Sequence, residues 1–222
     1  MRARRVIPLL LLVMVILAGC GIRADRFSDE DGARELLLSK LQERYGMAFV
    51  IAGNEKYHDF GQLYGFTYSC NVSPAAEPEK TAYAAVFQRA GAELLDDYIR
   101  WHYKEAAEAP VRTTLDRWGK AESYTVELAM EPTDKGWDAD APLDEFMREN
   151  GGYIETTVCL ETGESAETYT DQVMELLAAA KELPYPLLLR VKVGEAYIFW
   201  RELNGSGEVP RERVQEEVER NL

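Results

Sequence analysis

The chain has little of what catalytic and metal-binding proteins use most. Its 222 residues include only 2 histidines and 3 cysteines, and the zinc-binding spacings H-x-x-x-H and H-E-x-x-H are absent. It also lacks a C-x-x-C pair, a G-x-S-x-G around a serine, and a glycine-rich phosphate loop ending in Lys-Ser or Lys-Thr. We therefore expect no catalytic residues, no metal ion, no other cofactor and no enzyme activity.

Basic charge is scarce as well. The sequence holds 25 Lys and Arg residues against 39 Asp and Glu, which gives a formal net charge of −14. Such a surface repels phosphate groups, so we exclude nucleic acid as a partner. The hydrophobic content of 46%, with 23 aromatic residues, is ample for a core. The acidity therefore indicates a solvated surface and not disorder.

The sequence also lacks an apolar run long enough to cross a membrane. Arg2, Arg4 and Arg5 precede residues 6–18, which carry no charge over thirteen positions. A helix that spans the hydrocarbon core needs about 20 residues, so this run is too short. A positively charged start, a short apolar run and small residues at its end are typical of a secretory signal peptide.

The run ends in Leu17-Ala18-Gly19-Cys20, which resembles the lipobox of bacterial lipoproteins. The resemblance implies that the signal peptide, residues 1–19, is removed and that Cys20 becomes a lipidated first residue. The implied diacylglyceryl group has two acyl chains, which hold a protein stably on a lipid bilayer where a single chain does not. An ordinary signal peptide or an uncleaved anchor, with Cys20 incidental, is the alternative.

The lipobox also predicts location. Residues 20–27 would form a lipidated tether that reaches at most roughly 28 Å when fully extended. The folded part would then lie close to the cell membrane, on its extracytoplasmic side. Removal of residues 1–19 leaves 203 residues with a net charge of −17, because the removed segment holds three arginines and no acid.

Hydrophobic periodicity predicts an α+β fold, with antiparallel or mixed sheets and helices packed on one face. In the first half we expect a helix that begins at residues 28–31 and ends at Gly46. A second helix is expected at residues 92–107, closed by Pro110. Strands are expected at residues 47–53, 62–73 and 81–89. The inward face of the second helix should hold Leu95, Tyr98, Ile99, His102 and Ala106.

The second half predicts the order β-α-β-α-β-β. Its strands are expected at residues 122–130, 152–161, 186–193 and 196–202, and its helices from residue 140 or 141 to 149 and at 167–182. Gly194-Glu195 suits a hairpin turn between the last two strands. We divide the folded chain into a first lobe at 28–119, a second lobe at 120–204, and a linker with a C-terminal helix at 205–222. One continuous domain is the alternative.

The C-terminal helix is expected at residues 210–222. Val214, Val218 and Leu222 form a narrow apolar stripe along it. A helix of this length is marginal on its own, so the stripe either packs on its own domain or docks on a partner.

The first half also resembles small lipoproteins of Gram-positive bacteria whose activity is not characterised. The similarity lies in residues 41–49 (LQERYGMAF), in Ser73-Pro74 and in residues 96–103 (DDYIRWHY). It implies the same location and an α+β class, and it brings no reaction with it. The matching positions are Tyr45, Gly46, Phe49, Pro74, Asp96, Asp97 and Tyr98.

Two cysteines remain after Cys20. Cys70 shares one strand face with Phe66, Tyr68 and Val72, so we expect it to point inward. Val158 and Leu160 lie on one face of the second strand, and Cys159 between them lies on the opposite face. A bridge between them stays open, although the face pattern favours two separate thiols.

Three further motifs are outweighed by simpler interpretations. His58 is expected in a loop and His102 at the edge of a core. Asp138, Asp140, Asp144 and Glu149 have the spacing of a calcium loop, but its glycine position holds Leu143, so a helix start capped by Asp140 explains them better. The aromatic cluster could line a ligand groove but fits a core strand better. It consists of Tyr57, Phe60, Tyr64, Phe66 and Tyr68.

These observations predict a membrane-anchored extracytoplasmic lipoprotein that acts as a binding or assembly protein of the cell envelope. Its partners would be the lipid bilayer, through Cys20, and an envelope protein. A solute- or peptide-capturing lipoprotein is the first alternative, and a cell-wall hydrolase is the second.

Overall fold

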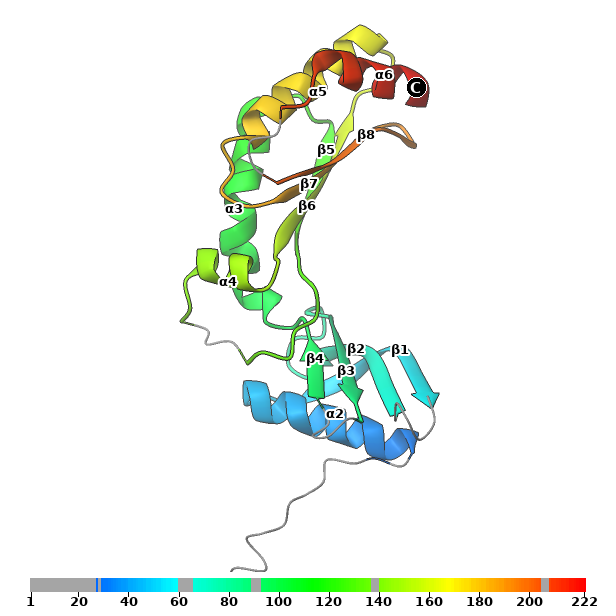
Figure 1. Ribbon diagram of the computed structural model, residues 1–222, viewed down its shortest axis with the longest axis vertical. Coiled ribbons are helices and arrows are strands. Elements are labelled where there is room, and N and C mark those ends of the chain that lie inside the picture. Colours follow the sequence, from blue (N-terminus) through cyan, green and yellow to red (C-terminus); the bar gives the residue numbers. More distant parts are fainter. Residues whose placement is uncertain (1–26, 28, 60–65, 89–92, 137–139, 205–207) are drawn as a thin grey trace, which may run out of the picture.

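The fold is α+β, as predicted. The computed structural model describes residues 27, 29–59, 66–88, 93–136, 140–204 and 208–222. Within them lie five helices and two four-stranded sheets. Figure 1 shows the two sheets toward opposite ends of an elongated molecule. The signal peptide, Cys20 and nearly all of the tether lie outside the described residues, so the lipobox stays a prediction.

The first helix has both of its predicted ends. Helix α2 (Glu30–Tyr45) starts after Asp29, whose carboxylate accepts a hydrogen bond from the Gly32 amide at 2.8 Å. It ends at Gly46, whose φ of +68° is the left-handed conformation that favours glycine at this position.

The first sheet is antiparallel throughout and runs in the order β1-β2-β3-β4. It consists of β1 (Phe49–Asp59), β2 (Phe66–Pro74), β3 (Ala82–Phe87) and β4 (Glu93–Asp96). Helix α2 packs on one face of it (Figure 1). The shared core holds Leu37, Leu41, Tyr68, Cys70, Val72, Val86 and Leu94. The first strand is buried on one side only, because Phe49 is 6% exposed whereas Val50 is 45% exposed.

The predicted helix at residues 92–107 is wrong. Residues 93–96 form β4, and helix α3 (Arg100–Trp118) starts only after a turn in which Asp96 Oδ1 accepts a hydrogen bond from the Tyr98 amide at 3.0 Å. The helix also continues past Pro110. A proline costs a helix interior about 3 kcal/mol, and burial of Val111 and Leu115 beyond it offsets that cost.

The later start also changes which face of this helix is buried. Tyr103, Ala107 and Val111 point into the core, whereas His102 and Ala106, predicted to face inward, are exposed. His58 lies in β1 and not in a loop.

The second half has the predicted order β-α-β-α-β-β. Its elements are β5 (Ser123–Ala129), α4 (Leu143–Glu149), β6 (Tyr153–Leu160), α5 (Ala166–Ala180), β7 (Leu187–Val193) and β8 (Ala196–Leu203). The sheet order is β5-β6-β7-β8, and β6 and β7 are parallel while the other pairs are antiparallel. Helix α4 begins after Pro142, which is its N-cap residue in place of the predicted Asp140.

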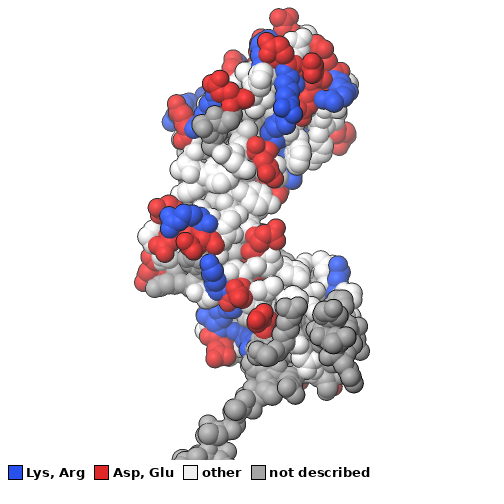
Figure 2. Space-filling model, viewed as in Figure 1, with Lys and Arg blue, Asp and Glu red and all other residues white. Residues whose placement is uncertain are grey.

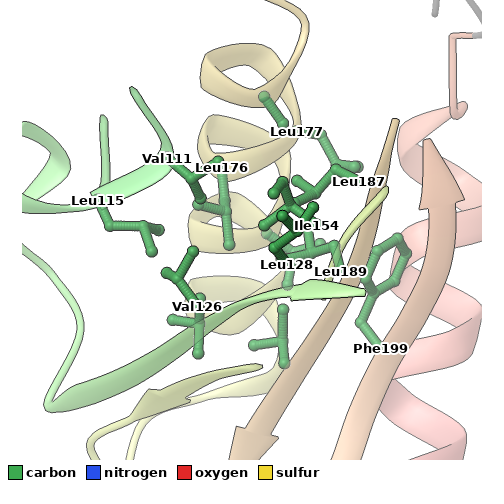
Figure 3. Close-up of a cluster of buried hydrophobic side chains, with 14 of the residues drawn as sticks. Val111, Leu115, Val126, Leu128, Ile154, Leu176, Leu177, Leu187, Leu189 and Phe199 are labelled. Atoms are coloured by element: carbon green, nitrogen blue, oxygen red, sulfur yellow. The ribbon is translucent and has the colours of Figure 1, made fainter. Parts of the chain in front are cut away.

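One face of the second sheet forms the larger core. Figure 3 shows side chains of α3 and α5 converging on those of all four strands. Val111 and Leu176 from the helices meet Val126, Ile154 and Leu189 from the strands in this cluster.

The C-terminal helix packs on its own domain. Helix α6 (Arg211–Asn221) contacts α5 and β8, and its Val214 and Val218 are fully buried. Glu217 adds an ion pair with Arg201 at 3.1 Å. Charged side chains of both signs crowd this end of the molecule, while much of the strip toward the first sheet is uncharged (Figure 2).

The division into lobes at residues 119 and 120 stays a prediction. Helix α3, which that division assigns to the first lobe, packs on the second sheet, and the two core clusters meet between Tyr98 and Ile99. The sheets are tied together by polar contacts near this point. Asp96 forms a β-bridge with Thr133, and Arg44 donates to Asp96 Oδ2 at 2.5 Å and to the Asp134 carbonyl at 2.8 Å.

The two cysteines are free thiols in different sheets. Cys70 in β2 is 1% exposed, which confirms that it points inward. Burial raises the pKa of its thiol to about 11. Cys159 in β6 is partly exposed.

Candidate functional site

A pocket of about 660 Å³ lies at one end of the second sheet, where β6 and β7 begin and β8 ends. Helix α4 with the turn after it forms one wall, and the loop from α5 to β7 forms another. The residues that line it are Glu131, Asp144, Met147, Arg148, Gly151, Gly152, Tyr153, Pro184, Tyr185, Pro186, Leu187, Leu188, Glu202 and Asn204.

The inner part of the pocket is apolar. Met147, Leu187 and Leu188 are each less than 7% exposed, and they reach it from α4 and from the start of β7. Pro184 and Pro186 add rigid apolar surface from the loop before β7. A ligand that covers these side chains would gain the free energy of removing apolar surface from water, at roughly 25 cal/mol per Å².

The rim of the pocket is acidic. Glu131, Asp144 and Glu202 are exposed carboxylates that approach it from three different segments of the chain. Arg148 is the one cationic residue among the described lining residues. Its guanidinium lies 3.7 Å from the carboxylate of Glu149, a residue that does not line the pocket.

Two tyrosines complete the lining. Burial, with Glu155 and Glu131 nearby, raises the pKa of Tyr153, and its hydroxyl donates to Glu155 at 3.3 Å. Burial, with Asp144 nearby, raises the pKa of Tyr185. Both phenols therefore stay protonated at neutral pH, and each offers a ring face and a neutral hydroxyl beside a carboxylate.

Two glycines bring the walls of the pocket close together. Gly151 has a φ of +60°, and the Gly152 amide donates to the Met147 carbonyl at 2.9 Å. A Cβ at Gly152 would lie 2.9 Å from Met147 Sδ, so a side chain at residue 152 would displace the Met147 side chain from its present position.

Helix α4 is short but firmly held. The ring of Phe146, which is fully buried, stacks on Tyr103 of α3 with 4.1 Å between ring centroids. The Tyr103 hydroxyl donates to the Ala141 carbonyl at 2.9 Å, just before α4 begins. The wall that carries Asp144 and Met147 is therefore built on the core of the second sheet.

The residues singled out in the sequence mostly lie elsewhere. Tyr68 is fully buried under α2, and Tyr57 packs against that core, which fits the core-strand interpretation. Phe60, Tyr64 and the side chain of Phe66 lie outside the described residues, as does Asp138 of the calcium-like stretch. His58 and His102 are in different elements, away from the pocket. Among the described residues, no cluster of acids, histidines and cysteines could hold a metal ion.

Sequence reasoning missed this pocket. Of the residues it considered, only Asp144 contributes to the lining, and it does so as a rim carboxylate. The available signals were Gly151-Gly152 before one strand and Pro184-Tyr185-Pro186 before the next, since such residues mark sharp turns. They do not reveal that the two turns lie side by side, which follows from the parallel pairing of β6 with β7.

The chemistry available in the pocket is that of binding. The lining residues that the structure describes offer carboxylates, phenols, an amide and a guanidinium, but no histidine, cysteine, serine or threonine. Such a set can hold a ligand by charge, hydrogen bonds and apolar contact.

Comparisons with known proteins add one similarity. No family model matches the chain, and no curated protein matches it. Among solved structures, it is similar to a DUF5037 family protein from Ruminococcus gnavus ATCC 29149, with a TM-score of 0.45 and 14% sequence identity over 82% of this chain and 97% of that chain. A similarity of this size does not assign a function.

Proposed function

We propose that this chain is a lipid-anchored, extracytoplasmic binding protein that recognises its ligand in the pocket between α4 and the second sheet. The pocket itself is the observation that carries the proposal. Its volume of about 660 Å³ lies within the range of small-ligand sites, and it combines an apolar interior with a few polar groups at the rim.

The location rests on the N-terminal sequence. Arg2, Arg4 and Arg5, the apolar run and Leu17-Ala18-Gly19-Cys20 together support export followed by lipid attachment at Cys20. No helix among the described residues is long and apolar enough to cross a membrane. A short tether before α2 would hold the first sheet near the bilayer and leave the pocket on the second sheet, further along the molecule, open to envelope proteins and solutes (Figure 1).

The ligand is either a free solute or side chains of an envelope protein, and both fit a cavity of this size. We do not propose cell-wall hydrolysis. The general acid of a glycosidase typically lies in an apolar environment shielded from water, whereas the rim carboxylates Glu131, Asp144 and Glu202 are all exposed.

A thermal-shift screen with sugars, short peptides, amines and metal ions tests the proposal. A ligand that binds the native state raises the melting temperature in proportion to ln(1 + [L]/Kd). The full-length protein should be compared with Tyr185→Ala, which removes a pocket ring, and with Tyr197→Ala, which removes an exposed tyrosine of β8 outside the pocket.

The proposal expects at least one class of ligand to stabilise the wild type and Tyr197→Ala but not Tyr185→Ala. A screen in which no class stabilises the wild type, or in which Tyr185→Ala responds like the wild type, would contradict the pocket as the binding site.

A further inference from the structure

We propose that the pocket takes an organic cation with an apolar body, either a free aliphatic amine or a lysine or arginine side chain of a protein. This inference rests on the proposed function and adds the chemistry of the ligand to it.

The rim carboxylates are unpaired within the part of the chain that the structure describes. Within the described residues, none of the rim carboxylates Glu131, Asp144 and Glu202 forms an ion pair, although Lys and Arg side chains make many such pairs elsewhere in the chain. Arg148 has Glu149 as a partner. The pocket therefore presents three unpaired carboxylates, and this acidic rim repels an anion.

The pocket has a charged outer layer and an apolar inner layer. The carboxylates lie at the rim, whereas Met147, Leu187 and Leu188 lie beneath them and are nearly or fully shielded from bulk water. A molecule with a charged head and an aliphatic chain matches both layers, because its head can stay hydrated beside the carboxylates while its chain covers the apolar side chains. A metal ion would match the rim alone.

The two tyrosine rings of the pocket lie in the field of the rim carboxylates. Tyr153 and Tyr185 are partly buried in the wall, and Glu131 acts on the first phenol and Asp144 on the second. Glu155, which accepts the hydrogen bond of Tyr153, is paired with Arg190 and adds no free charge. The face of an aromatic ring attracts an ammonium or a guanidinium group electrostatically. Ring face and carboxylate therefore favour the same charge on the ligand.

Three probes of equal chain length test the sign of the charge. Butylammonium, 1-butanol and butyrate should be titrated into the full-length protein at one ionic strength, with the amide signals of Gly151 and Gly152 followed by NMR. These amides lie in the pocket wall, so their shifts report binding at this place. We expect saturable shifts with butylammonium, at an affinity at least about fivefold above that of 1-butanol.

Variants that neutralise rim carboxylates test whether these charges cause the tighter binding of butylammonium. The pair Glu131→Gln and Glu202→Gln should weaken butylammonium binding about three- to tenfold. The matched control is the pair Glu105→Gln and Glu216→Gln, which changes the net charge equally at exposed positions of α3 and α6 and should leave the affinity unchanged.

A peptide arm separates the two sources of the cation. Acetyl-Leu-Lys-Leu-amide should bind more tightly than acetyl-Leu-Gln-Leu-amide, whether the natural ligand is a free amine or a protein side chain, because only the first peptide carries a cation. If the lysine peptide also binds more tightly than butylammonium, the occupant is a protein side chain, and if it binds more weakly, the occupant is a free amine.

The outcomes keep this inference apart from the proposed function. If 1-butanol or butyrate shifts the Gly151 and Gly152 signals at an affinity equal to that of butylammonium, the cation is wrong and the pocket remains a binding site. If no probe gives saturable shifts, the proposal of a cationic ligand is also wrong, and the proposed function then depends on the thermal-shift screen alone.

Discussion

The backbone amide of Leu128 donates a hydrogen bond to Glu108 Oε1 across 2.9 Å. Four residues further along α3, Arg112 Nη2 donates to the Val126 carbonyl, also at 2.9 Å. Strand β5 is an edge strand of the second sheet, so these backbone groups have no neighbouring strand to pair with. The side chains of α3 take the place of that strand and protect the edge from pairing with another chain.

Glu108→Gln should destabilise the protein by about 1–3 kcal/mol. The Glu108 side chain is 4% exposed, and it accepts hydrogen bonds from Lys104 at 2.6 Å and from Arg112 at 2.9 Å besides that from Leu128. A neutral amide cannot satisfy both cations. Urea unfolding at pH 7 measures the loss, with Glu105→Gln on the exposed side of the same helix as the control.

The loss should shrink in acid. Burial opposes ionisation of Glu108, but hydrogen bonds from Lys104, Arg112 and the Leu128 amide outweigh it and hold the pKa of this carboxyl below its ordinary value of 4.5. A depressed pKa contributes stability that is present above the ordinary value and is lost as the pH falls through the folded one. A difference between wild type and Glu108→Gln that stays constant from pH 7 to pH 3 would refute this role.

Gly152→Ala should disturb the pocket. The new Cβ would lie 2.9 Å from Met147 Sδ and 3.4 Å from Met147 Cα, so the Met147 side chain must move within the pocket lining. We expect a loss of about 1 kcal/mol in unfolding free energy and a change in any ligand affinity. Gly136→Ala is the control, since a Cβ there meets nothing within 4 Å. Equal melting temperatures and affinities for the two variants would contradict the close approach.

The two strand thiols should differ in reactivity. Cys70 is buried and its pKa is raised to about 11, whereas Cys159 is partly exposed. In the native protein, Ellman's reagent at pH 8 should modify Cys159 quickly and Cys70 only on unfolding. Reducing agent should barely change the melting temperature. A fall of about 5 °C or more on reduction would instead reveal a disulfide.

Deletion of residues 208–222 should lower the melting temperature by on the order of 10 °C. It removes Val214 and Val218, which are fully buried, and exposes the surface of α5 and β8 that they cover. Differential scanning calorimetry measures the shift. An unchanged melting temperature would mean that α6 does not stabilise its own domain.

The fold was predictable where the local pattern is regular. Period-two alternation located the strands around Cys70 and Val158, and residues 28–31 and Gly46 indicated the two ends of α2. The α3 region failed because Leu94 and Leu95 fit a helix period as well as a short strand. Only tertiary contacts decide between them, through the pairing of β4 with β3 and the turn at Asp96.

The candidate site was not predictable for a related reason. Its residues come from α4, β6, β7 and β8, from the segment after β5 and from the turns next to these elements, and each stretch alone is an ordinary turn, helix or strand end. Burial of Leu188 beside an exposed Glu202 is a product of strand register, which the sequence does not display. Lipid attachment at Cys20, in contrast, could be predicted from the sequence, because the lipobox pattern lies in consecutive residues.

The lipid anchor at Cys20 is the claim on which both location and class of function depend. Cys20→Ala should abolish palmitate labelling and release the chain from the membrane fraction, because the apolar run of residues 6–18 is too short to hold it. Equal labelling in this variant would contradict the lipobox.

Mass spectrometry of the N-terminal peptide from the membrane-purified wild-type protein tests this claim most directly. The account predicts a peptide that begins at Cys20, carries the mass of a diacylglyceryl group on its sulfur and lacks residues 1–19. A peptide that begins at Met1, or a Cys20 with an unmodified thiol, would contradict it.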